Sequence, residues 1–262
     1  MNYLNAIKDV EEGLHKRALW LALGMQDIRQ RYRRSVLGPL WLTISMGVMI
    51  AAMGPLYGSL FGYNPASFIP HLALGLMFWG FISGQINDFC EAFSNSSHYL
   101  RQMRLPLSVF LFRVMYRHAI ILAHNLVVYV FVWAVLPVHL NNSLLYLPLS
   151  AVLVLANIFW IGCLVSIFCT RFRDMQPVVV NLIQVMFFLT PIIWKAEQLS
   201  EARQKLIHLN PFFYLLELLR EPLLGIVPAA AIWIRASAMA LIGTALAVYM
   251  LAKYRHRVAY WL

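Results

Sequence analysis

Two long stretches of the chain carry no charged side chain, and each is long enough to cross a membrane twice. Residues 35–87 and residues 118–170 contain no Asp, Glu, Lys or Arg. A helix needs about 20 apolar residues to cross the hydrocarbon core of a bilayer. Turn-forming residues divide each stretch, at FGYNP (61–65) in the first and at LPVHLNN (136–142) in the second. The pattern predicts two pairs of membrane-spanning helices.

Two shorter apolar stretches, residues 175–194 and 236–252, add a fifth and a sixth span. We therefore predict an all-α integral membrane protein that forms one domain over residues 1–262. The predicted spans are residues 36–60, 69–90, 107–136, 145–169, 176–194 and 230–252.

The N-terminal segment shows a different pattern, with an apolar stripe on an otherwise basic helix. The stripe has helical spacing and consists of Leu14, Ala18, Leu21, Met25, Ile28 and Tyr32. A helix with an apolar stripe and an arginine-rich polar face lies in the headgroup region of a membrane. We predict an amphipathic interface helix over residues 14–34, because no sizeable soluble domain is present for it to pack on.

The connection between the last two spans is too long and too apolar for a simple loop. Residues 197–225 contain two short helical patterns, and Asn210 followed by Pro211 is a typical helix start. Three charges in the second helix, at Glu217, Arg220 and Glu221, would be costly in the middle of a bilayer. A re-entrant helix pair fits better than a seventh span, and a static lid is the alternative.

Composition and charge agree with the membrane assignment. Hydrophobic residues make up 61% of the chain and charged residues only 12%, against about 25% charged residues in soluble domains. The net charge of +10 is concentrated in short blocks between the apolar runs. This arrangement favours anionic membrane lipids, rather than nucleic acid, as the partner of the basic residues.

The basic blocks also predict the orientation. Most of the 21 Lys and Arg residues lie in the N-terminal segment, between the second and third spans, near residues 171–173 and at the C-terminus. Basic residues favour the cytoplasmic side, and an even number of spans places both termini on one side. We expect both termini to be cytoplasmic.

The sequence lacks the usual signs of catalysis or metal binding. The three cysteines form no CxxC pair, and the eight histidines show no HxxxH or HExxH spacing. No G-x-x-x-x-G-K-[ST] phosphate loop is present. If transport is driven by ATP, hydrolysis therefore belongs to another chain, and we predict no catalytic residue and no metal site here.

Residues 26–44, QDIRQRYRRSVLGPLWLTI, resemble the signature at the first span in membrane (permease) subunits of type-two ABC exporters for polysaccharides, most closely the O-antigen exporters. The matching residues are Asp27, Ile28, Arg31, Tyr32, Arg33, Leu37, Gly38 and Trp41, with Gln26 where the family usually has arginine. Further likenesses follow in order: RQMRLPLSVF (101–110), RFRDMQPVV (171–179), TPIIW (190–194), NPFFYLLELLREPLLG (210–225) and AYWL (259–262).

The resemblance implies a homodimer in a bacterial inner membrane that assembles with two copies of a nucleotide-binding ATPase subunit. ATP and Mg²⁺ would bind to that subunit, and this chain would be no enzyme by itself. The cargo would be an undecaprenyl-diphosphate-linked polysaccharide, with O-antigen first and capsule or teichoic acid as alternatives. Outside the family, a polytopic transferase acting on the lipid carrier is the rival, but it would need an acid, base or metal cluster that the sequence does not show.

Four groups of residues are then candidates for function. Arg29, Arg31, Arg33 and Arg34, with Tyr32 among them, could attract the diphosphate at a cytoplasmic entrance. The resemblance assigns residues 94–104 to a coupling helix that docks on the ATPase, with candidates His98, Tyr99, Leu100, Arg101, Met103 and Arg104. It assigns the glycan channel to Trp41, Tyr57, Phe187, Phe188 and Trp194, and a periplasmic gate to Pro191, Asn210, Pro211, Glu217 and Arg220. Positive-inside bias for the arginines and an aromatic belt for the ring residues are the alternatives.

Overall fold

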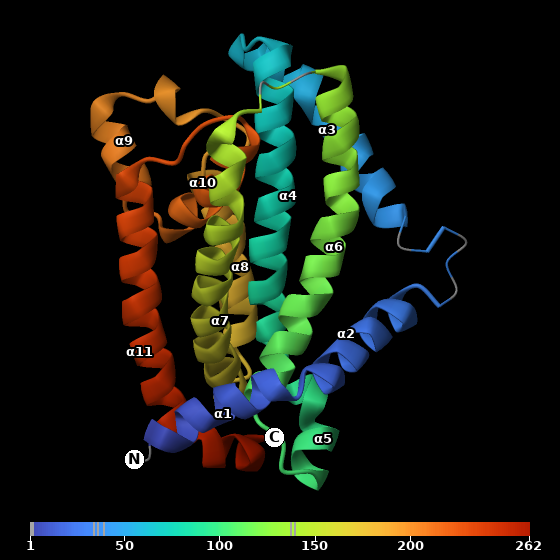
Figure 1. The fold of residues 1–262 in the computed structure, drawn as a ribbon, viewed down its shortest axis with the longest axis vertical. Coiled ribbons are helices and arrows are strands. Elements are labelled where there is room, and N and C mark those ends of the chain that lie inside the picture. The colour runs from blue at the N-terminus through green and yellow to red at the C-terminus, as the bar shows by residue number, and fades with distance from the viewer. Residues whose placement is uncertain (1–2, 34, 36, 39, 137, 139) are drawn as a thin grey trace.

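The computed structural model describes residues 3–262 except 34, 36, 39, 137 and 139, and says nothing of the side chains of residues 201–203. All regular structure in the described residues is helical, which confirms the predicted all-α class. The long helices run side by side, and both chain ends lie at one end of the bundle (Figure 1). We call this end the termini end, and the opposite one the α9 end.

Five helices of the described chain are long and apolar enough to cross a membrane. They are α3 (Leu40–Phe61), α4 (Pro65–Phe89), α6 (Ser108–Val135), α7 (Leu147–Arg171) and α11 (Ala230–Trp261). The fifth predicted span, residues 176–194, corresponds to α8 (Met175–Leu189), which has 15 residues and is therefore about 22 Å long. Five of the six predicted spans thus have the necessary length, and the span at residues 176–194 stays a prediction.

The end of α8 has a local cause. Thr190 leaves the helical conformation, with φ −96° and ψ 136°, and the next residue is Pro191. The proline ring clashes with a preceding residue in the α conformation and pushes it towards extended backbone. The sequence TPIIW therefore ends the helix before it reaches the length that the hydropathy pattern predicts.

Helix α4 lies at the centre of the bundle and is covered by its neighbours (Figure 1). Phe68, Met77 and Phe89 are among its fully buried side chains. Close approach depends on small residues, as in many membrane helix pairs. A Cβ atom at Gly162 of α7 would lie 2.5 Å from the Phe89 ring, so a larger residue there would force the two helices apart.

The N-terminal segment forms two helices across the termini end, α1 (Tyr3–His15) and α2 (Arg17–Arg31) (Figure 1). The single helix predicted over residues 14–34 is therefore wrong in its extent: the chain breaks at Lys16, where φ is −81° and ψ is 35°. The buried residues of α1 are Ala6, Asp9 and Gly13, which are small or polar. The apolar spacing extends back from Leu14 to Ile7 and Leu4, but on the exposed side of α1. The prediction therefore started the helical region too late.

Asp9 fixes α1 to two other helices although it is an acid with no exposed surface. Its carboxylate accepts the backbone N–H groups of Leu107 at 3.1 Å and Ser108 at 3.0 Å, which begin α6. It also pairs with Arg255 of α11, with Nε and Oδ2 2.9 Å apart. The first N–H groups of a helix have no partner within the helix, so Asp9 caps α6 from outside.

The short helices lie in the connections. At the termini end, η1 (Ser94–Ser96) and α5 (Ser97–Gln102) occupy the predicted coupling segment. At the α9 end are η2 (Asn142–Tyr146), η3 (Ala196–Gln198), α9 (Glu201–Ile207) and α10 (Pro211–Leu223). The Asn210 side chain accepts the Phe212 N–H at 2.9 Å and caps α10. Residues 197–225 thus form a helix pair, whose re-entry into the membrane stays a prediction.

Replacing Asp9 by alanine removes the cap of α6 and leaves Arg255 without its partner. We expect a loss of about 3 kcal/mol in unfolding free energy, as for other buried pairs from which one member is removed. Thermal unfolding of the purified protein in detergent measures the change. Glu12→Ala is the control, because Glu12 is exposed on the same helix; equal stability of the two variants would contradict the capping role.

Candidate functional site

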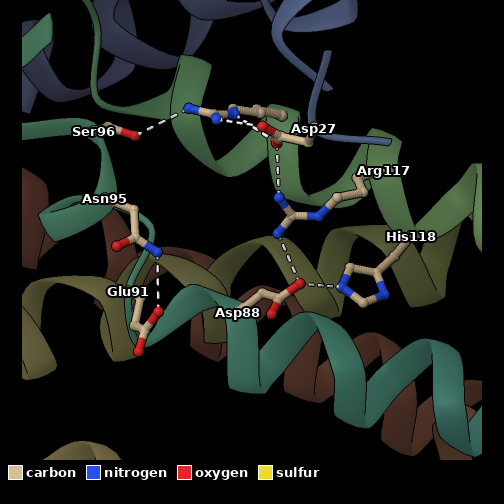
Figure 2. Close-up of polar contacts among 8 residues, drawn as sticks. Asp27, Asp88, Glu91, Asn95, Ser96, Arg117 and His118 are labelled. Atoms are coloured by element: carbon tan, nitrogen blue, oxygen red, sulfur yellow. Dashed lines mark hydrogen bonds and ion pairs between the residues drawn. The ribbon is translucent and has the colours of Figure 1, made fainter. Parts of the chain in front are cut away.

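An ionic network joins α2, α4 and α6 at the termini end (Figure 2). Asp27 of α2 is its first centre. Arg113 of α6 donates to both oxygens of Asp27, at 2.8 Å from Nε and 2.5 Å from Nη2. Arg117, one turn further along α6, donates to Asp27 at 2.7 Å. Only 11% of the Asp27 side chain is exposed, so the two arginines neutralise a largely buried acid.

Asp88 near the end of α4 is the second centre. Arg117 donates from Nη2 to Asp88 Oδ2 at 2.7 Å and so bridges the two aspartates. The His118 ring nitrogen Nε2 lies 2.6 Å from the same oxygen. The His118 ring fits because its neighbour is Gly84, where a Cβ atom would approach the ring to 2.7 Å. Side chains from successive turns of α6 thus bind two acids that belong to different helices.

The network extends into the 94–104 segment. Arg113 donates from Nη1 to the Ser96 hydroxyl oxygen at 3.4 Å. On the other side of the segment, Asn95 donates to Glu91 at 3.0 Å (Figure 2), and Gln176 at the start of α8 donates to the other oxygen of Glu91. Displacement of this segment would therefore disturb contacts with α2, α6 and α8.

The six candidates for ATPase docking divide into two sets. His98, Arg101, Met103 and Arg104 are exposed, whereas Tyr99 and Leu100 are half-buried. The Tyr99 ring lies 6.4 Å from the Phe110 ring of α6. The exposed set is available to a partner, and Tyr99 and Leu100 instead anchor the segment on the bundle.

The arginines at the end of α2 and in the turn after it, which we call the α2 arginines, differ from those in the network. Arg29, Arg31 and Arg33 are exposed, and no carboxylate of the described residues lies within salt-bridge distance of them. Tyr32 is half-buried among them, and burial raises the pKa of its hydroxyl. Arg34 lies outside the described residues. This surface is an uncompensated cluster of positive charge.

A second polar cluster lies at the α9 end around Arg220 of α10, which is 2% exposed. Arg220 forms an ion pair with Glu217 one turn earlier. It also donates to the backbone oxygen of Pro191 at 2.7 Å and to His71 Nε2 of α4 at 3.1 Å. Arg220 therefore ties α10 both to α4 and to the segment after α8.

The five gate candidates gather at this junction. Pro191, Glu217 and Arg220 are joined as described, and Asn210 donates to the Thr190 hydroxyl oxygen at 2.8 Å. Pro211 is the first residue of α10. A cavity of about 530 Å³ opens beside them and is lined by Asn210 and Pro211, and by Phe188, Trp194 and apolar residues from α9.

The channel candidates are only partly brought together. Phe188 and Trp194 line the same cavity as the gate residues, and the Phe187 ring packs against Trp79 at 6.0 Å between centroids. Trp41 lies in a separate shallow groove along α3. Tyr57 stacks on Phe61, with centroids 5.9 Å apart. Of the five candidates, Phe188 and Trp194 share a cavity in one chain, and the other three lie in separate surroundings.

Sequence reasoning missed the network itself. Its members are Asp27, Asp88, Arg113, Arg117 and His118. The available signals were Asp88 as the first charge after a 53-residue gap and two arginines four residues apart at the start of a span. Among the described residues, no group of three or more His, Cys, Asp and Glu is placed to hold a metal ion.

The chain matches known transport proteins. The family described as ABC-2 type transporter matches residues 18–224. The O-antigen export system permease protein RfbA of Myxococcus xanthus is 25% identical over 233 residues, which cover 80% of this chain and 82% of that protein. Two Klebsiella pneumoniae proteins of the same name are 23% and 25% identical, and cover 74% and 90% of this chain and 75% and 93% of their own lengths.

Glu221 makes stability at the α9 end depend on pH. Burial, with the nearby charge of Glu217, raises the pKa of Glu221 from 4.5 to about 7, and Arg220 opposes the change. One oxygen of Glu221 is buried and has no hydrogen-bond partner among the described residues. The folded state holds this proton more tightly than the unfolded state, so the contribution of Glu221 to stability is complete below pH 4.5 and is lost as the pH rises to about 7.

Glu221→Gln removes the fall in stability between pH 4.5 and 7, because glutamine stays neutral at every pH. We expect the variant and the wild type to unfold at similar temperatures at pH 5, and the variant to unfold at the higher temperature at pH 8. Thermal unfolding in detergent at both pH values measures the difference. Glu197→Gln, an exposed acid at the same end, serves as control; parallel pH profiles for wild type and Glu221→Gln would contradict the assignment.

Proposed function

The chain belongs to the ABC-2 type transporter family, and on this basis we propose that it is the channel-forming subunit of an exporter for polysaccharide linked to undecaprenyl diphosphate. The O-antigen export permeases among its relatives cover most of both chains and favour O-antigen as the cargo. Capsule and teichoic acid remain alternatives within the same family. The chain acts as the membrane permease subunit, and ATP hydrolysis belongs to the ATPase of the transport system.

In the proposed assembly, two copies of this chain lie in a bacterial inner membrane with their termini ends towards the cytoplasm. Two ATPase subunits bind there with ATP and Mg²⁺. The exposed arginines of α2 and the basic residues of the 94–104 segment support this orientation, because cytoplasmic segments are rich in Lys and Arg. The exposed apolar faces of α3 and α8 support a second copy or lipid as neighbours.

The observation that carries the proposal is the bond from Arg113 to both Asp27 and Ser96. A transport subunit needs a physical connection between the surface on which the ATPase acts and the helices that open the path. Arg113 connects the 94–104 segment with α2 and α6, and Arg117 continues the connection to α4. ATP-driven movement of the segment would thus shift the interface helix and two spans together.

The substrate would meet α2 first. Arg29, Arg31 and Arg33 have no carboxylate partners in the described structure and can bind the diphosphate through charge-assisted hydrogen bonds. At the α9 end, Phe188 and Trp194 line the cavity beside the gate residues. Aromatic faces suit sugar rings, whose C–H groups pack on them.

Asp27→Asn keeps the shape of the side chain and removes the charge that both arginines neutralise. With the complex reconstituted in liposomes, we expect basal ATP hydrolysis to persist and stimulation by lipid-linked glycan to fall about tenfold, which corresponds to about 1.4 kcal/mol of lost coupling. Hydrolysis rates with and without the glycan measure the effect. Glu12→Gln is the matched control; a wild-type response in Asp27→Asn would contradict the coupling role.

Charge reversal of the α2 arginines tests the proposed cargo. The triple variant R29E/R31E/R33E should lose export, because it repels the diphosphate, yet still insert and dimerise. Surface glycan is measured in a strain that lacks its own exporter and receives this chain with its ATPase. The variant K8E/K16E/R17E changes the net charge equally at exposed positions of the same segment. Unchanged export in the first variant, or equal loss in both, would contradict a position-specific role.

A further inference from the structure

An apolar groove runs between α7, α8 and α11 near the termini end, away from the ionic network. Its volume is about 540 Å³. Leu164 and Phe168 of α7, Val179 of α8 and Leu246 of α11 belong to its lining. Phe168 and Leu246 are each more than 40% exposed. The groove therefore opens to the outside of the helix bundle.

One end of the groove is basic and aromatic. Arg171, the last residue of α7, lies in the lining, and Tyr254 and Trp261 from the last turns of α11 complete it. The guanidinium carbon of Arg171 lies 5.2 Å from the ring centroids of both Phe172 and Trp261. Lys253 is close by, with its ammonium group 5.2 Å from the Tyr254 centroid.

These two cations differ from the other basic residues near the same end. Arg113, Arg117 and Arg255 each form an ion pair with an aspartate. For Arg171 and Lys253, no carboxylate of the described residues lies within salt-bridge distance. The aromatic rings hold these cations in place without neutralising them, and both remain available to an anion.

The chemistry of the groove therefore changes along its length. From Leu164 to Arg171 it extends about 10 Å along α7, with apolar side chains inside and uncompensated charge at the mouth. Aromatic residues beside Lys or Arg are typical of the level of the lipid headgroups. An acyl chain fits the apolar part, and a phosphate at the mouth can accept hydrogen bonds from a guanidinium.

We propose that this groove is a binding site for an anionic diacyl phospholipid, with one acyl chain between α7, α8 and α11 and the phosphate on Arg171. Lys253, outside the lining but on the ring of the lining residue Tyr254, adds positive charge near the mouth and favours a net negative lipid. A zwitterionic headgroup is disfavoured because its own cation would be repelled by two unpaired positive charges. The site is separate from the α2 arginines, and it does not depend on the proposed cargo.

Native mass spectrometry of the purified full-length chain tests the proposal. The protein is given equal amounts of phosphatidylglycerol and phosphatidylcholine with identical acyl chains, and the bound lipids are counted. We expect the wild type to retain phosphatidylglycerol about tenfold better. Arg171→Gln should lose this preference, and Arg171→Lys should keep part of it because the charge remains.

A second variant tests the groove independently of the charge. Leu246→Trp fills the groove with Arg171 intact, and we expect it to lose retained lipid of both kinds. Arg257→Gln removes a positive charge from an exposed position of the same helix outside the groove and should behave like the wild type. Size-exclusion profiles identify any variant that does not fold, in which case the other variant decides.

Three results would overturn the proposal. These are equal retention of the two lipids by the wild type, an undiminished preference in a folded Arg171→Gln variant, and undiminished retention in a folded Leu246→Trp variant. Displacement of phosphatidylglycerol by an equal amount of undecaprenyl diphosphate would likewise overturn the assignment to a phospholipid, and would place the lipid carrier in the groove.

Discussion

The termini end of the molecule depends on the pairing of charge where an apolar bundle meets the N-terminal segment. Two aspartates of that segment, Asp9 and Asp27, contact α6 at different turns. Asp9 accepts the free N–H groups that begin α6, and Asp27 receives two arginines further along. Removing either acid would leave unsatisfied donors or buried positive charge, which costs more than the pair itself contributes. The position of α1 and α2 on the bundle follows from these contacts.

Pairing also separates the arginines by role. Arg113, Arg117, Arg220 and Arg255 lie against acids or carbonyl groups and join helices to one another. The exposed arginines of α2, and Arg171 at the groove, have no such partner in the described structure. The first set therefore joins helices to one another, whereas the second is available to anions. A count of positive charge along the sequence does not distinguish the two sets.

The fold was predictable where the membrane imposes the pattern, and less so elsewhere. Charge-free stretches mark α3, α4, α6 and α7 because a bilayer excludes charge over a fixed thickness. Helix α1 was missed although Leu4, Ile7 and Leu14 recur at helical spacing, because charged residues lie between them and Asp9 and Gly13 form its buried face. Asp27 and Arg113 are 86 positions apart. A single sequence does not reveal which distant residues pair. The network could therefore not be predicted, although all of its charged residues could be identified.

The early end of α8 explains why the gate candidates and a cavity occur together. The break at Thr190 and Pro191 frees backbone groups that a continuous helix would satisfy internally, and neighbouring groups must then satisfy them in an apolar environment. Arg220 donates to the freed Pro191 carbonyl, and Asn210 donates to the Thr190 hydroxyl. Because α8 stops, Trp194 and α9 can fold around the space that a longer helix would fill. The same break therefore shortens α8, positions Arg220 and creates the cavity, so that movement of α10 would alter the contacts of Arg220 and the shape of the cavity together.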